Sequence, residues 1–187
     1  MRRTHRALAG VLALFLALHL GNHLAGLLGQ ATHGTVQAAL RTIYRNPLVE
    51  PLLLLAVAMQ IGLGLALFVR RRRWTLQTAS GLYLAFFLLI HLGAVLSARW
   101  HGTETDLAFA AAGLHAPDPW PAVFALYYGL AVLAVFAHLS VPLSRQWPAG
   151  GTASLALGTS VAVMLVALLA GQITPLVIPP DLIAAFP

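Results

Sequence analysis

The chain is organised around Gln77–Gly93, which reads Q-T-A-S-G-L-Y-L-A-F-F-L-L-I-H-L-G and carries one histidine, His91, near its far end. At helical spacing, Gln77, Ser80 and His91 fall on one face, and Gly81 lies beside them. A titratable ring at membrane depth is costly unless it faces a bundle interior with a partner, which makes His91 a candidate functional residue. The other interpretation is a neutral core histidine that bonds to a neighbouring helix.

The first apolar segment repeats this pattern. Gly10–Gly21 reads G-V-L-A-L-F-L-A-L-H-L-G, a near copy of Gly81–Gly93 with one residue fewer between glycine and histidine. Counted from the predicted start of each helix, His19 lies about 12 residues in and His91 about 16 residues in, so both are expected in the outer half of a membrane. His23 follows His19 by one turn and shares its face.

Composition excludes a soluble globular domain. Hydrophobic residues make up 59% of the 187 residues, charged residues 9%, and the mean hydropathy is +0.83, whereas soluble domains are usually about half apolar. Runs of about 20 apolar residues, the length that crosses a bilayer, lie near 7–28, 48–69, 75–97, 121–143 and 153–175. The sequence predicts an all-α integral membrane bundle of five transmembrane helices, with residues 1–187 forming a single transmembrane domain.

Charge placement predicts the orientation, because cytoplasmic loops carry an excess of basic residues. All eleven basic residues are arginine, and eight fall on one side: Arg2, Arg3, Arg6, Arg70–Arg73 and Arg145. The other three, with all five acids, fall on the opposite side. We expect a cytoplasmic N-terminus and an external C-terminus. The protein is expected to be a multi-pass protein of a bacterial-type inner (cytoplasmic) membrane. The net charge of +6 then reflects topology, so the lipid bilayer is the expected partner and nucleic acid is not.

The connections between the apolar segments contain fewer residues that indicate structure or function than the apolar segments do. Gln30–Pro47 is expected to be external and mildly amphipathic, with an apolar face that could cap a site: Val36, Ala39, Leu40 and Ile43. Ala98–Pro119 is expected to be a longer external loop. The fifth apolar segment has Thr159 and Ser160 as its internal polar groups, and we interpret it as packing.

Two imidazoles at matched depth suit the axial positions of a haem b, which takes one nitrogen from each side of the iron. His19 and His91 are the predicted pair, with His23 as the substitute ligand on the first helix. The chain has no cysteine, so thiolate and iron–sulfur ligation from its own residues are excluded. A zinc site would need three or four ligands. That site, a histidine proton relay and histidines that only bond across helices remain alternatives.

Trp74–Leu92, W-T-L-Q-T-A-S-G-L-Y-L-A-F-F-L-L-I-H-L, resembles the haem-ligating helix of the cytochrome b membrane subunit of succinate dehydrogenases and fumarate reductases, in the five-helix, single-chain type. In that family a small polar-Gly element precedes the ligand histidine by about ten residues. Ser80-Gly81 and His91 match this element, and Ala9 and Gly10 match it less closely ahead of His19. The resemblance extends along the chain in helix number and orientation.

The resemblance implies a membrane-embedded electron-transfer subunit. It would pass electrons between a quinone pool and soluble iron–sulfur and flavoprotein subunits on the cytoplasmic side. His19 and His91 match the ligands of the outer haem, and His138, in H-L-S-V-P-L-S-R, matches the ligand on the fourth helix. The second-helix position is Gln60, and glutamine is not a usual haem ligand. One haem b is therefore expected, with Gln60 and His138 bonded to each other.

A quinone site is expected where the second helix enters the membrane. Tyr44, Arg45 and Glu50 gather hydrogen-bonding groups there, and quinol oxidation needs a base such as a carboxylate within reach of the hydroxyl. The alternative is that Arg45 and Glu50 form an interfacial pair while Tyr44 is a belt aromatic. Arg45 could also neutralise a haem propionate.

Two other functions stay open. One is a haem-free membrane anchor or scaffold that holds a partner complex, with the histidines kept as bonds between helices. The other, a small transporter, is disfavoured because inverted repeats and broken helices at the midplane are absent from the pattern. The expected role is that of a quinone-reactive or non-catalytic membrane subunit of an oxidoreductase complex, and assembly into a homo-oligomer is an open alternative.

Overall fold

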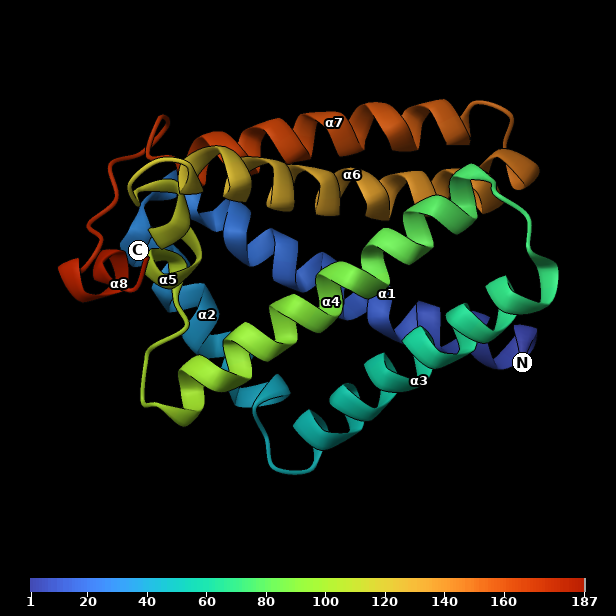
Figure 1. The fold of residues 1–187 in the computed structure, drawn as a ribbon, viewed down its shortest axis with the longest axis horizontal. Helices are drawn as coiled ribbons and strands as arrows, with labels where there is room; N and C mark the ends of the chain where they lie inside the picture. Colours follow the sequence, from blue (N-terminus) through green and yellow to red (C-terminus); the bar gives the residue numbers. More distant parts are fainter. Residues whose placement is uncertain (187) are drawn as a thin grey trace. The chain divides into compact units, whose positions relative to one another are not determined.

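The structure is a computed structural model that describes residues 1–186. It divides into two compact units, Met1–Trp74 and Thr75–Pro187. The first unit contains α1 (Arg2–Ala25), the 3-10 turn η1 (Gly26–Leu28), α2 (Gln30–Tyr44) and α3 (Val49–Arg71) (Figure 1). The second contains α4 (Leu76–Trp100), α5 (Leu107–Ala111), η2 (Ala112–Leu114), α6 (Trp120–Gln146), α7 (Gly150–Leu169) and α8 (Pro180–Ala184).

Five helices are long and apolar enough to cross a membrane: Arg2–Leu28, Val49–Arg71, Leu76–Trp100, Trp120–Gln146 and Gly150–Leu169. The all-helical class and the five long apolar helices predicted from sequence are confirmed. The predicted bounds were less accurate at the two ends of the chain. The first helix begins at Arg2 because charged residues do not break a helix. The last stops at Leu169, since Gly171 takes a left-handed φ of 71° that ends a helix.

A sharp break separates α3 from α4. Arg72 has a φ of 46°, which a helix cannot continue, and Thr75 then caps α4. The Thr75 hydroxyl accepts a hydrogen bond from the Thr78 N–H at 3.2 Å, and the Thr78 hydroxyl accepts one from the Thr75 N–H at 2.8 Å. These reciprocal bonds satisfy backbone donors that a helix start leaves open and begin the Q-T-A-S-G stretch in a defined register.

The connection at residues 30–47 is a helix over most of its length. Of the predicted apolar face, Val36 and Leu40 are half-buried and Ala39 is exposed, and the capping role stays a prediction. Gly29, with φ 112°, turns the chain into α2. The buried residues of α2 are polar, His33 and Gln37, one turn apart, whereas Ile43 is exposed. His33 turns inward because it finds a hydrogen-bond partner on α1. The second connection, at residues 98–119, also holds the short helices α5 and η2.

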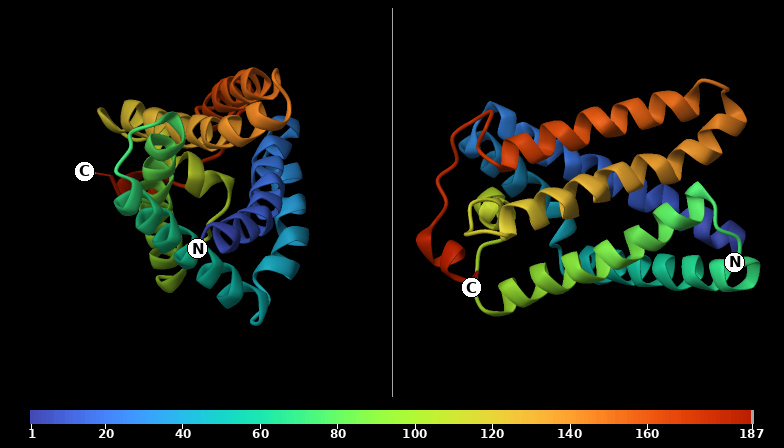
Figure 2. Two further views of the ribbon diagram at one scale, coloured as in Figure 1. Left: turned by 90° about the vertical axis from the view of Figure 1, so that its right-hand side faces the viewer. Right: turned by 45° about the horizontal axis from the view of Figure 1, so that its top comes forward.

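In the second unit, α6 and α7 run side by side (Figure 2). Small residues allow the close approach: Gly158 of α7 lies against Phe136 of α6, and the buried Ser154 donates a hydrogen bond to the Phe136 carbonyl at 2.8 Å. The packing role predicted for α7 agrees with its buried residues. The two polar residues named for it in the sequence analysis do not take part in this packing. Thr159 and Ser160 are exposed and bond to carbonyls of their own helix, as hydroxyls in apolar helices commonly do.

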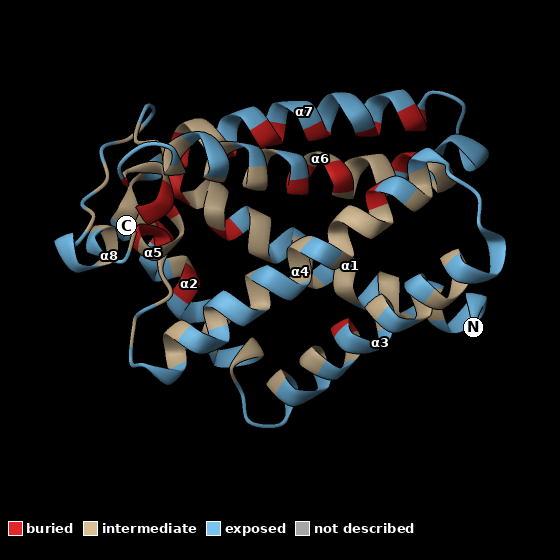
Figure 3. Cartoon of the chain, viewed as in Figure 1, coloured by how far each residue is buried: buried red, intermediate tan, exposed pale blue. Residues whose placement is uncertain are grey.

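The remaining long helices bury little (Figure 3). Helices α1, α3 and α4 have one buried residue each, Asn22, Val57 and Ser80. Large apolar side chains on all five long helices are more than half exposed, among them Leu14, Leu52, Leu89, Leu126 and Val163. Such continuous apolar surface is not tolerated in water and suits contact with lipid. The five helices therefore indicate a multi-pass membrane protein.

Candidate functional site

His19 lies on α1 with its ring held by aromatic neighbours of the same unit. The ring stacks on Phe15, one turn earlier, with centroids 5.7 Å apart and planes 18° from parallel. On its other side His23 meets it edge-on at 4.8 Å. Side chains four residues apart on a helix face each other, so Phe15 limits the rotation of the His19 ring.

His91 on α4 has the same local arrangement in the second unit. It stacks on Phe87, one turn earlier, at 5.2 Å with the planes 13° from parallel. The Gly-to-His repeat seen in the sequence is therefore also a repeat in structure, a phenylalanine supporting a histidine ring. The two histidines belong to different units of the chain, His19 to the first and His91 to the second.

Phe87 is in turn held by Tyr127 of α6. The Tyr127 hydroxyl donates to the Phe87 carbonyl at 3.3 Å, and the two rings lie 4.6 Å apart. In the reverse direction, the Tyr83 hydroxyl donates to the Tyr127 carbonyl at 3.0 Å. These two hydrogen bonds fix the register of α4 against α6. They therefore also fix the position of Phe87, on which the His91 ring stacks. Sequence reasoning did not assign a role to either tyrosine.

The Q-T-A-S-G stretch lies against His138 of α6, although its residues were predicted as part of the stripe of His91. His138 Nδ1 donates to the Gln77 carbonyl at 2.9 Å and lies 3.4 Å from the Ser80 hydroxyl. A Cβ on Gly81 would lie 3.0 Å from His138 Cε1, so a larger residue there would require the imidazole to shift. Donation from Nδ1 leaves the lone pair on Nε2, the state in which a metal-binding imidazole is usually held.

A polar cluster joins α1 to α2 in the first unit. Asn22 Nδ2 donates to His33 Nε2 at 3.1 Å, and the rings of His23 and His33 lie 5.6 Å apart. Asn22, His33 and Gln37 are all buried. His23, the predicted substitute ligand, is therefore the middle ring of a row that runs from His19 to His33. His33 and Gln37 are one helical turn apart in the sequence, which indicates a polar face on α2. The sequence-based prediction did not use this spacing.

Gln60 of α3 lies beside His5 of α1, which the sequence did not single out. Gln60 Nε2 is 3.4 Å from His5 Nε2. The predicted bond between Gln60 and His138 would join the two units and stays a prediction. Within their own units, Gln60 meets His5, and His138 meets a backbone carbonyl of α4. His5 stands among the arginines from which the topology was predicted, and nothing in the sequence pattern separated it from them.

The candidate quinone residues lie at the junction of α2 and α3. The Tyr44 ring meets Phe15 edge-on at 5.7 Å, so it contacts the residue that supports His19. Arg45 ends α2, with its N–H bonded to the Arg41 carbonyl at 3.0 Å. Glu50 lies in the first turn of α3, where a carboxylate is favoured by the helix dipole.

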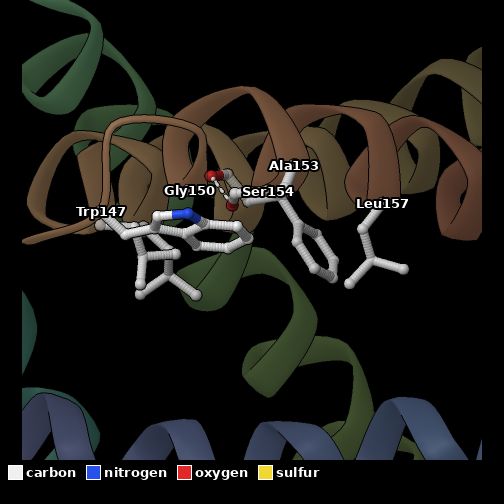
Figure 4. A pocket seen from close by; sticks show the side chains of 8 residues that line it. Trp147, Gly150, Ala153, Ser154 and Leu157 are labelled. Atoms are coloured by element: carbon white, nitrogen blue, oxygen red, sulfur yellow. Dashed lines mark hydrogen bonds between the residues drawn. The ribbon is translucent and has the colours of Figure 1, made fainter.

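Among residues 1–186, no group of three or more histidine or acidic residues is placed to hold a metal ion. Haem needs only two protein ligands, so the haem prediction does not depend on such a group. The hollow of about 230 Å³ between α6 and α7 has no histidine or other titratable residue in its lining (Figure 4). It is lined by Phe136, Leu139, Leu143, Trp147, Gly150, Ala153, Ser154 and Leu157.

Comparison of the chain with protein-family models, curated proteins and solved structures found no match. The resemblance to cytochrome b membrane subunits therefore rests on the residues themselves, chiefly those of Trp74–Leu92. The haem and quinone assignments remain predictions.

Proposed function

We propose that this protein is a membrane-embedded haem b electron-transfer subunit that passes electrons between a quinone pool and a partner protein. The observation that carries the proposal is the matched setting of two histidines: His19 and His91 each stack nearly parallel on a phenylalanine one turn earlier. A haem b held by two imidazoles exchanges single electrons and has no open position for oxygen. Phe15 and Phe87 would hold the two ligand rings in fixed orientations.

The distribution of arginines supports the proposed membrane location and orientation. Eight of the eleven arginines would face the cytoplasm in a bacterial-type inner membrane, and soluble iron–sulfur and flavoprotein subunits would bind on that side. The runner-up is a haem-free anchor, favoured by the hydrogen bonds that already occupy His33 and His138. An optical spectrum of the purified protein distinguishes the two, because the proposed subunit has the Soret and α bands of low-spin haem b and the anchor has neither.

Glu50 is proposed as the proton acceptor of a quinol site that Tyr44 and Arg45 complete. Glu50→Gln removes the base without changing the shape of the side chain, so haem reduction by added quinol is expected to slow by about 100-fold, with an unaltered haem spectrum. Rapid-mixing spectroscopy measures the rate. Asp181→Asn, which removes an exposed acid from α8, is the matched control. An unchanged rate in Glu50→Gln would remove this residue from the mechanism.

Tyr127 is proposed to position the His91 ring through Phe87. Tyr127→Phe removes one hydrogen bond, worth about 1 kcal/mol, and frees the Phe87 turn to shift. The low-spin g-values in the electron paramagnetic resonance spectrum and the midpoint potential are expected to change while haem content stays the same. Tyr128→Phe is the control, since it removes the neighbouring hydroxyl but not the bond to Phe87. Identical spectra for both variants would argue against this role.

A further inference from the structure

Seven exposed arginines gather at one end of the first unit. Three lie at the start of α1 and four end α3 or follow it: Arg2, Arg3, Arg6 and Arg70–Arg73. His5 holds the two helices together there, because its Nε2 lies 3.4 Å from Gln60 Nε2 and a Cβ on Gly64 would lie 3.6 Å from its Cε1. The start of α1 and the end of α3 lie at the same end of this unit in Figures 1 and 2. We call these seven residues the arginine cluster.

The first unit has no carboxylate side chain near this cluster. Its one acid, Glu50, lies in the first turn of α3, 20 residues before Arg70 and therefore about 30 Å from it along the helix. The four acids of the second unit are predicted on the opposite side of the membrane. Helix α1 has no acid in its first turn, where the helix dipole disfavours positive charge. The anions that balance the cluster are therefore expected from outside the unit.

Depth in the membrane indicates which anions these are. The uncharged part of α3, Pro51–Val69, is about 28 Å long, close to the thickness of about 30 Å of a hydrocarbon core. Arg70 follows directly, so the guanidinium groups begin at the level of the lipid phosphates. Arg72 ends the helix with a φ of 46°, and the Trp74 ring then meets Phe68 of α3 edge-on at 5.2 Å. The segment that follows α3 is therefore held at the membrane surface.

Arginine suits a phosphate partner at this level. Its planar guanidinium donates two parallel hydrogen bonds to a phosphate, and clusters of four to eight basic residues beside a transmembrane helix typically bind anionic lipids. The cluster contains arginine and no lysine. An acidic protein surface fits less well, because it would have to reach the phosphate level of the bilayer.

We propose that the arginine cluster binds the phosphate groups of anionic phospholipids in the cytoplasmic leaflet, and that α1 and α3 share the bound lipid. The inference goes beyond the proposed function and does not depend on haem. Two other interpretations compete with it. In one, the arginines only orient the chain during insertion; in the other, they bind an acidic soluble protein.

Quenching of Trp74 fluorescence measures lipid binding beside the cluster. Trp74 is kept, and the other three tryptophans are replaced by phenylalanine. The full-length protein is reconstituted into phosphatidylcholine vesicles that contain a small fraction of brominated phosphatidylglycerol or of brominated phosphatidylcholine. We expect the anionic lipid to bind beside Trp74 about tenfold more tightly than the zwitterionic lipid. Equal quenching by the two lipids would overturn the proposal, and it is the result that both competing interpretations predict.

Salt tests the electrostatic basis with every arginine in place. In NaCl at about 1 M the Debye length is about 3 Å, so the preference for the anionic lipid is expected to fall severalfold. A preference that persists at this salt concentration would overturn binding through arginine and phosphate. This measurement stands even where an arginine variant fails to insert.

Two double variants locate the site. Arg2→Gln/Arg3→Gln and Arg71→Gln/Arg72→Gln each remove two charges from one helix or its end, and each is expected to lower the relative affinity for phosphatidylglycerol by about fivefold or more. Arg145→Gln is the control, since it removes an exposed arginine that is predicted on the same side but belongs to the second unit. An unchanged preference in either double variant, or an equal loss in Arg145→Gln, would overturn the proposed site.

Discussion

His91→Ala is expected to release one haem b per chain from a protein that still inserts into the membrane. The substitution removes the ring nitrogen that binds the iron, and alanine offers nothing in its place. The segment around it stays apolar, so the span itself is retained. His19→Ala is expected to lose the same haem. Haem content and the low-spin optical spectrum of the purified variants are the measurements.

Two comparisons make the result interpretable. His101→Ala, at the C-terminal end of α4, is the matched control and should keep the wild-type haem content. His23→Ala tests the substitute ligand on α1, whose ring meets that of His19 at 4.8 Å. If His91→Ala keeps the full haem content and spectrum, the ligand assignment is wrong. If His23→Ala rather than His19→Ala loses the haem, the ligand on α1 is His23.

Gly158→Ala is expected to have the largest effect on stability. The added Cβ would lie 2.4 Å from the Cβ of Phe136, and neither atom can rotate away because each is fixed by its helix backbone. Helices α6 and α7 must therefore move apart locally, which also strains the bond from Ser154 to the Phe136 carbonyl. Overpacking of this kind typically costs about 1–3 kcal/mol. Thermal unfolding of the protein in detergent measures the loss.

Gly129→Ala provides the control at the same pair of helices. Its added Cβ would lie 3.7 Å from Val166, an ordinary contact, and alanine favours a helix over glycine by about 1 kcal/mol. We therefore expect Gly129→Ala to be neutral or stabilising. Equal unfolding temperatures for Gly158→Ala and the wild type would mean that α6 and α7 are not in close contact at Gly158.

The features that the sequence predicted correctly are those that depend on one helical segment at a time. Five apolar runs predict five long helices because hydrophobic length and helical geometry are properties of each segment alone. The Gly-to-His repeat likewise predicted that His19 and His91 lie at matched depth, and a residue four positions earlier lies on the same face of each helix. Phe15 and Phe87 are in the sequence at that spacing, whereas the nearly parallel stacking of each ring pair is seen only in the structure.

Contacts between helices could not be predicted in this way. Gln77, Ser80 and Gly81 were assigned to His91 because they share its face, yet Gln77 and Ser80 bond to His138, 61 and 58 positions away along the chain. His5 beside Gln60 and Asn22 beside His33 were missed for the same reason. Periodicity determines which residues share a face of one helix. Which partner that face meets depends on side-chain packing between helices, as where a Cβ on Gly81 would lie only 3.0 Å from the His138 ring.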